Sequence, residues 1–167
     1  MKPRLLIVTG APGSGKTTLA QQLGAEGHLP VLSRDRLKEG YAHTHGQGHA
    51  ELPASANAEV TELFFATLEL WIAEGISCIA EAAYQEPLWR PGLEPLRERA
   101  DIAVLICSLA EEVLAARLAK RAEEDPAHAY YHGTAAVGNY VEPQLDLPMF
   151  RADPEGLQAV QDWLQGT

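Results

Sequence analysis

The chain has 167 residues, of which 46% are hydrophobic, and this suits one globular α/β domain with a core of its own. The formal net charge of −10, from 23 acidic and 13 basic residues, would repel a nucleic-acid strand and favours a small substrate. No apolar run approaches the roughly 20 residues of a membrane span, and no signal peptide is seen at the N-terminus. We therefore expect a cytoplasmic protein that does not bind membranes.

The first segment predicts a strand, a glycine-rich loop and a helix, in that order. A strand is expected over 4–9 around the apolar run Leu5–Val8, and a helix-compatible stretch covers 18–26. Between them, residues 10–17 read Gly-Ala-Pro-Gly-Ser-Gly-Lys-Thr and match the P-loop (Walker A) pattern G-x-x-x-x-G-K-[ST]. In this motif the backbone N–H groups surround phosphate oxygens, the lysine reaches the terminal phosphates and the hydroxyl, here of Thr17, binds Mg²⁺. The expected nucleotide-binding residues are Gly10, Ala11, Pro12, Gly13, Ser14, Gly15, Lys16, Thr17 and Thr18.

The rest of the chain alternates between expected strands and helices. The further strands are expected at 29–32, 76–82, 102–107 and 147–151, the last at a sheet edge because Pro148 cannot donate a ladder hydrogen bond. The further helices are expected at 36–41, at 56–74, at 87–99 with breaks at Pro91 and Pro95, from a Ser108–Glu111 capping box to about 124, and from an Asp153 cap onward. This order predicts a single domain over residues 1–167 with the three-layer αβα architecture of P-loop NTPases. Its five-stranded sheet is mainly parallel and has helices on both faces.

Two acidic residues come at the carboxyl ends of expected strands, where parallel strands place their ligands. Asp35 follows the second strand, where it could orient a substrate hydroxyl and accept its proton, or could simply be the N-cap of the next helix. Glu81 ends the third strand at the Walker B position, where it could hold Mg²⁺ directly or through water, or could be a strand-end carboxylate without a metal. The residues alone leave both pairs of interpretations open.

Two arginines lie four residues apart on the helix after the fourth strand. Arg117 and Arg121 share a helix face, and a lid helix could place one or both guanidinium groups on the transferring phosphate. The alternative is a solvated face whose charges Glu123, Glu124 and Asp125 neutralise.

Cysteines and histidines give no strong metal signature. Cys78 and Cys107 each lie in an apolar run and are expected to be reduced core thiols. The loop expected over 42–54 carries several histidines, but a flexible glycine-rich loop is a poor scaffold for a preformed metal site. We expect a solvated loop or a wall of a substrate pocket. The histidines of this loop are His43, His45 and His49, and two more, His128 and His132, follow further along the chain.

The P-loop, Ser33-Arg34-Asp35 and the Arg-x-x-x-Arg helix together resemble the small P-loop kinases of the polynucleotide-kinase, zeta-toxin and chloramphenicol-phosphotransferase type. The resemblance extends over nearly the whole chain. It implies that Asp35 is the general base, and that Arg117 and Arg121 belong to a short helical lid over about 117–140. It also implies that Lys16 and Thr17 are the P-loop lysine and hydroxyl, and that 147–154 line the adenine pocket. Glu81 departs from the group, in which the Walker B acid is often Asp.

We expect an ATP-dependent kinase that uses Mg²⁺ and transfers the γ-phosphate to a hydroxyl of a small molecule, whose contacts would come from 36–60 and 84–90. One alternative is a 5′-hydroxyl polynucleotide or nucleoside kinase with a basic channel lined by Arg34, Arg36 and Lys38, and another is a toxin-like nucleotide-sugar kinase. A non-enzymatic nucleotide switch of the GTPase type is disfavoured, because the chain has no N-K-x-D base-reading motif.

Overall fold

Five parallel strands form one sheet in the order β2-β3-β1-β4-β5. The computed structural model of the protein describes residues 1–46, 48–125, 130 and 140–166. The strands are β1 (Arg4–Gly10), β2 (Val31–Ser33), β3 (Cys78–Glu81), β4 (Asp101–Cys107) and β5 (Met149–Arg151). The predicted three-layer α/β P-loop fold is therefore confirmed, and β5 pairs with β4 at the edge, as Pro148 suggested.

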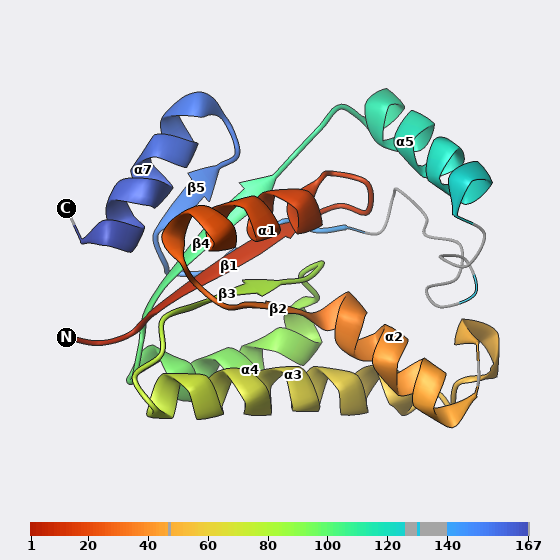
Figure 1. The fold of residues 1–167 in the computed structure, drawn as a ribbon, viewed down its shortest axis with the longest axis horizontal. Coiled ribbons are helices and arrows are strands. Elements are labelled where there is room, and N and C mark those ends of the chain that lie inside the picture. The colour runs from red at the N-terminus through yellow and green to blue at the C-terminus, as the bar shows by residue number, and fades with distance from the viewer. Residues whose placement is uncertain (47, 126–129, 131–139, 167) are drawn as a thin grey trace.

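Helices cover both faces of the sheet. They are α1 (Lys16–Gly27), α2 (Arg34–His45), α3 (Ala56–Ala73), α4 (Glu86–Arg97), α5 (Glu111–Glu124) and α7 (Pro154–Gln165), with a short 3₁₀ helix η1 (His49–Glu51). Helices α1 and α7 lie on one face, and α3 and α4 lie on the other (Figure 1). Helices α2 and α5 lie toward the end of the molecule at which β1 gives way to α1 (Figure 1). That end carries the candidate site.

The core explains why the strands are apolar throughout. On β1, Leu5 and Ile7 point into a cluster with α3 and α4 that includes Trp89. Their neighbours Leu6 and Val8 point into a second cluster with α1 and α7. Successive strand residues face opposite sides, so a strand covered on both faces needs an apolar residue at every position.

Helix α2 is longer than predicted. It begins at Arg34, directly after the capping residue Ser33, and continues to His45, where Gly46 adopts a left-handed conformation (φ 64°) and ends it. No residue between 41 and 45 breaks a helix, so the His-rich segment adds a turn instead of forming a loop. The ring of Tyr41 stacks on that of His45, with 4.2 Å between centroids.

Two predicted helix details are wrong. Helix α5 begins at Glu111 with Ala110 as N-cap and no side-chain cap, so Ser108 makes no capping box. Glu111 and the next residue, also acidic, instead place negative charge beside the helix N-terminus. Helix α4 is continuous through Pro91 and Pro95, because burial of its apolar face compensates for the missing N–H donors.

The final helix is capped as predicted: the Asp153 side chain accepts a hydrogen bond of 2.8 Å from the Gly156 N–H. Within the part of the chain that the structure describes, no helix is long and apolar enough to span a bilayer. The expected lid over 117–140 stays a prediction, because 126–129 and 131–139, with His128 and His132, lie outside the described residues.

Candidate functional site

The loop between β1 and α1 is shaped to receive an anion. Gly13 and Gly15 have φ values of 82° and 88°, a left-handed conformation that favours glycine, and Gly15 is the N-cap of α1. The first N–H groups of α1 have no acceptor within the helix, and its positive end faces the loop. The Ser14 hydroxyl oxygen is buried and has no hydrogen-bond partner among the described residues. Both features fit a bound phosphate, which would accept from these donors.

Gly10 is required for a different reason. A Cβ atom at this position would lie 2.3 Å from the backbone oxygen of Cys107 on β4 and 2.5 Å from the Ser14 hydroxyl. The absence of a side chain therefore lets the loop leave the sheet beside β4. Within the predicted binding set, the buried residues are Gly10, Ala11, Ser14 and Lys16, the half-buried ones are Pro12, Gly13, Gly15 and Thr17, and Thr18 is exposed.

A buried carboxylate lies beneath the loop. Glu81, at the carboxyl end of β3, is 0% exposed and accepts a hydrogen bond of 3.1 Å from the Thr17 hydroxyl. The side chain of Lys16 is also buried. Burial raises the pKa of Glu81, while the hydrogen bond from Ser33 and the charge of Lys16 act in the opposite direction. The hydroxyl and carboxylate oxygens provide the oxygen ligands that Mg²⁺ prefers.

Ser33 joins this carboxylate to α2, and sequence reasoning assigned it no role. Its hydroxyl donates to Glu81 over 2.6 Å and accepts from the Arg36 N–H over 3.4 Å, which makes it the N-cap of α2. Asp35 is therefore not the N-cap; it lies half-buried in the first turn of the helix. The Asp35 carboxylate is close enough to add to the effect of burial in raising the pKa of Glu81. A serine directly between a strand and a helix with an acidic first turn was the signal available in the sequence.

Arg34 does not line a basic channel. Its guanidinium is buried and donates to the Thr61 hydroxyl over 2.9 Å and to the backbone oxygen of Asn57 over 3.0 Å, which ties α2 to α3. Burial lowers the pKa of Arg34. Lys38 is buried as well, and Arg36 pairs with Glu39 at 2.7 Å.

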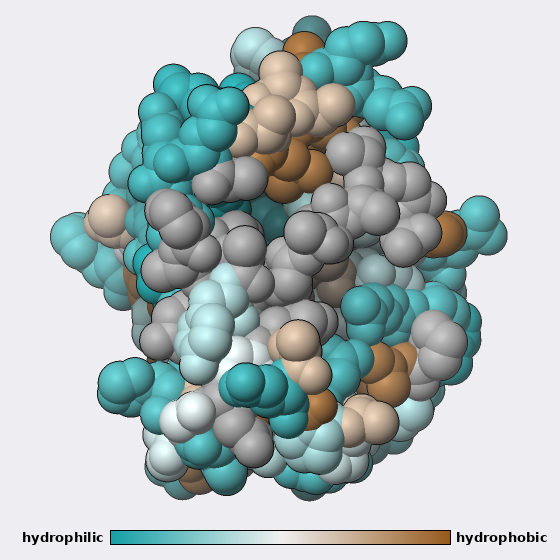
Figure 2. Space-filling model, turned by 90° about the vertical axis from the view of Figure 1, so that its right-hand side faces the viewer, coloured by the Kyte–Doolittle hydropathy of each residue, from teal (hydrophilic) through white to brown (hydrophobic). Residues whose placement is uncertain are grey.

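Of the two arginines on α5, Arg117 lies at the loop. Its Nη1 donates to the Gly13 oxygen over 3.4 Å and lies 3.5 Å from where a Cβ on Gly15 would be. Leu118 packs against Gly13 from the same helix. Arg121 is exposed one turn further along, and no hydrogen bond between described residues joins its side chain to the loop. Figure 2 shows this end of the molecule, with hydrophobic residues gathered on its upper side.

The two cysteines are buried thiols, and Cys107 lies beside Gly10 at the end of β4. Burial raises the pKa of the Cys78 thiol to about 12 and that of Cys107 to about 11. Both are free and buried, as predicted. His43 and His45 lie on the last turn of α2. Over the described ranges, no group of three or more His, Cys, Asp or Glu side chains could hold a metal ion.

Comparison with known proteins shows the family of this chain and structures with a similar fold. The AAA domain family matches residues 5–138. A structure from Chloroflexus aurantiacus, described as that of a candidate kinase, has a TM-score of 0.83 and 26% identity over 99% of this chain and 98% of that chain. APS kinase from Mycobacterium tuberculosis, in complex with AMPPNP and APS, has a TM-score of 0.66 and 21% identity over 99% of both chains. A chain of the Pnkp1/Rnl/Hen1 RNA repair complex has a TM-score of 0.61 and 25% identity over 74% of this chain and 39% of that chain. No curated protein matches.

Proposed function

Because the chain belongs to the AAA domain family and has the fold of the small P-loop kinases, we propose that it transfers the γ-phosphate of ATP to a hydroxyl group of a small molecule. One observation carries this proposal. The P-loop, the Thr17–Glu81 hydrogen bond and the first turn of α2 with Asp35 converge at the carboxyl edge of one sheet. That arrangement provides separate groups for the donor phosphates, for a cation and for the acceptor proton.

The donor side is built by the P-loop. The backbone N–H groups at the start of α1 would bind the phosphates, and Lys16 would neutralise charge on the terminal ones. Thr17, with Glu81 behind it, would hold Mg²⁺, which when bound neutralises charge that develops on the phosphates. The unpartnered Ser14 hydroxyl and the tight approach at Gly10 support a cradle that phosphate completes.

Asp35 is the proposed general base. A carboxylate in the first turn of α2, close to Glu81, would orient the acceptor hydroxyl and take its proton as the O–P bond forms. The hydrogen bonds of Ser33 would hold this turn in place relative to the cation site. Asp35 therefore acts on the acceptor, and Lys16 acts on the donor.

Arg117 is the arginine proposed to stabilise the transferring phosphoryl group. Its guanidinium already lies over the loop, and a planar cation with several N–H donors suits phosphate oxygens. Arg121 would add to this after a movement of α5. We expect a larger loss of kcat from Arg117→Ala than from Arg121→Ala, with Lys120→Ala as a control on the same helix.

The test measures ATP binding and phosphoryl transfer separately. Asp35→Asn should leave the Kd for ATP within about threefold, because the side chain lies off the P-loop. It should lower kcat by at least about 10²-fold, the usual contribution of a general base. Lys16→Ala should weaken ATP binding itself. Full transfer activity of Asp35→Asn on an identified acceptor would remove Asp35 as the base.

A 5′-hydroxyl kinase acting on nucleic acid is the second candidate. The likeness to a chain of an RNA repair complex favours it. The burial of Arg34 and Lys38 and the net charge of −10 speak against it, since a strand of phosphates needs an accessible basic groove. Transfer to a 5′-hydroxyl oligonucleotide that weakens steeply with added salt would select this alternative.

A further inference from the structure

A cavity lies between the segment that joins β3 to α4 and the segment that precedes β5. It has a volume of about 660 Å³, and its walls include Tyr84 and Glu86 on one side and Val141 and Glu142 on the other. This volume falls within the range of small-molecule sites, about 300–1,000 Å³. Nothing in the donor chemistry proposed above uses these residues.

One hydrogen bond holds the chain at Tyr84, which lines this cavity, next to the start of the nucleotide loop. The Tyr84 N–H donates to the Thr9 hydroxyl over 3.0 Å, and Thr9 immediately precedes Gly10 of the P-loop. Tyr84 is also three residues beyond Glu81, which places their Cα atoms at most about 11 Å apart. The cavity therefore begins within a short reach of the proposed cation site.

A second, smaller cavity lies at the P-loop. Its volume is about 320 Å³, and it is lined by Ala11 of the P-loop and by Leu114 of α5. Glu142 lines both cavities, so the larger one lies next to a cavity that reaches the P-loop.

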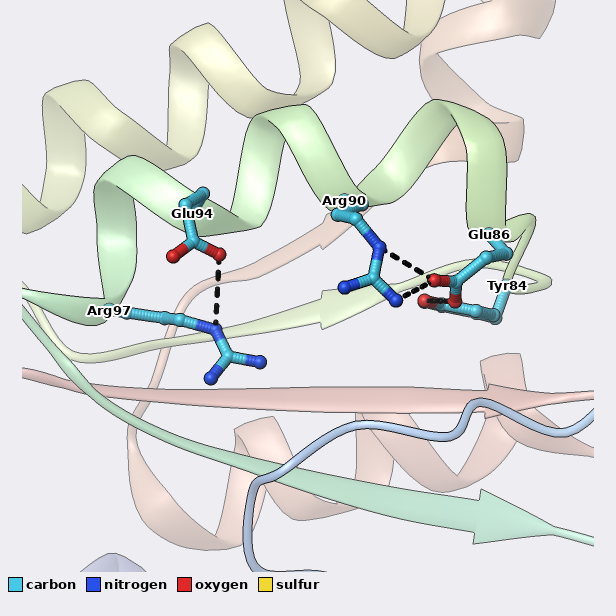
Figure 3. Close-up of polar contacts among 5 residues, drawn as sticks. All are labelled: Tyr84, Glu86, Arg90, Glu94 and Arg97. Carbon is cyan, nitrogen blue, oxygen red and sulfur yellow. Dashed lines mark hydrogen bonds and ion pairs between the residues drawn. The ribbon is translucent and has the colours of Figure 1, made fainter.

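Each acid of the cavity wall is paired with an arginine. Figure 3 shows Arg90 directed at Glu86, to which its Nε donates over 2.8 Å, with the Tyr84 hydroxyl donating to the same carboxylate. The other acid, Glu142, accepts two hydrogen bonds of 2.6 and 2.8 Å from Arg151, which lies outside the lining. Burial and the Glu86 carboxylate raise the pKa of Tyr84, so its hydroxyl keeps its proton. The wall thus carries two acids, each paired with an arginine, and two glutamine amides add further donors and acceptors.

We infer that this cavity is the acceptor site of the proposed kinase and takes a neutral polyhydroxyl compound, a sugar or a cyclitol. Each alcohol group both donates and accepts, so a pair of neighbouring hydroxyls can bind a carboxylate and its guanidinium together. An anionic acceptor would meet Glu86 and Glu142, whose arginine partners are already engaged, and would find little compensation for its desolvation.

The inference rests on the proposed function for its chemistry. A hydroxyl oxygen of the sugar forms the new bond to the γ-phosphorus, and the bond from that phosphorus to the β–γ bridging oxygen breaks. The hydroxyl proton passes to the Asp35 carboxylate, and ADP leaves. The products are ADP and a sugar phosphomonoester, so atoms and charge balance.

The test is direct binding in the absence of nucleotide. Neutral monosaccharides, alditols and cyclitols are titrated by calorimetry against their own monophosphates. At least one neutral compound should bind, and its monophosphate should bind at least tenfold more weakly. Glu142→Gln and Tyr84→Phe should each weaken that binding by fivefold or more. Glu69→Gln, which breaks an exposed ion pair with Arg99 outside the cavity, should not change it.

Each outcome separates this inference from the proposed function. Neutral polyols that bind but receive no phosphate would retain the cavity assignment and remove the kinase. Phosphoryl transfer to an anionic compound or an oligonucleotide, with no polyol binding, would retain the kinase and overturn the inference. Binding of none of the neutral compounds, or binding unaffected by both cavity variants, would also overturn it. Circular dichroism verifies that both variants fold. If Glu142→Gln does not fold, Tyr84→Phe, which keeps the aromatic ring, still tests the inference.

Discussion

Replacing Ser33 with alanine removes one hydroxyl that makes two hydrogen bonds. The bond to Glu81 is short, at 2.6 Å, and joins a buried carboxylate, for which hydrogen bonds contribute about 1.5–3 kcal/mol. The longer N-cap bond from Arg36, at 3.4 Å, belongs at the lower end of capping energies, about 0.5 kcal/mol. We therefore expect Ser33→Ala to lower the free energy of unfolding by about 2–3 kcal/mol. For a chain of this length that corresponds to a Tm about 5–10 °C lower.

The assay is equilibrium unfolding in urea, followed by circular dichroism at neutral pH. Thr44→Ala is the matched control, because it removes an exposed hydroxyl whose hydrogen bond to the Gly40 oxygen stays within α2. We expect a change within about 0.5 kcal/mol for that variant. A loss for Ser33→Ala no larger than that of Thr44→Ala would refute the role of Ser33 as the link between the buried acid and α2.

Three further predictions concern the same region and the core. Arg34→Gln should lower the free energy of unfolding by about 2–4 kcal/mol, because it leaves two acceptors on α3 without their hydrogen-bond donor. Arg36→Gln should change it by less than about 0.5 kcal/mol. Both variants are measured by unfolding in urea. With folded pKa values of about 12 and 11, Cys78 and Cys107 should resist a thiol reagent at pH 8 until urea unfolds the chain. Thiols of the unfolded chain titrate near 8.5, so above that pH the folded state binds more protons than the unfolded state. The free energy of unfolding should therefore fall as the pH rises above about 8.5. Rapid labelling of the folded protein would contradict this prediction. Gly10→Ala should weaken ATP binding at least tenfold by calorimetry, because its Cβ would meet backbone at 2.3 Å, and unchanged affinity would contradict the close approach.

Sequence patterns predicted the elements that depend on local order. The run over residues 4–17 identified the strand, the loop and the start of α1, because the motif carries its own spacing and both flanks agree. The strand-end positions of Asp35 and Glu81 followed from parallel topology, which brings carboxyl ends to one edge. Their proposed roles remain to be tested.

What could not be predicted depends on partners distant in the chain. Ser33 meets Glu81 across 48 residues, and no local pattern specifies that hydrogen bond. The sequence indicated an accessible cation at Arg34, whereas in the structure α3 provides acceptors for its buried guanidinium. The predicted capping box at Ser108 is wrong, because the S-x-x-E pattern indicates only where a helix could begin. The helix after β4 begins at Glu111 instead.

The central claim is that this P-loop delivers a phosphoryl group to an alcohol. Phosphorus NMR of the protein with ATP, Mg²⁺ and the panel of neutral polyols tests it most directly, because a sugar phosphomonoester and inorganic phosphate give separate resonances. We predict a phosphomonoester signal that grows as the γ-phosphate signal of ATP declines, and that is lost with Asp35→Asn. Conversion of ATP to ADP and inorganic phosphate alone, or no consumption of ATP with any acceptor, would contradict the account.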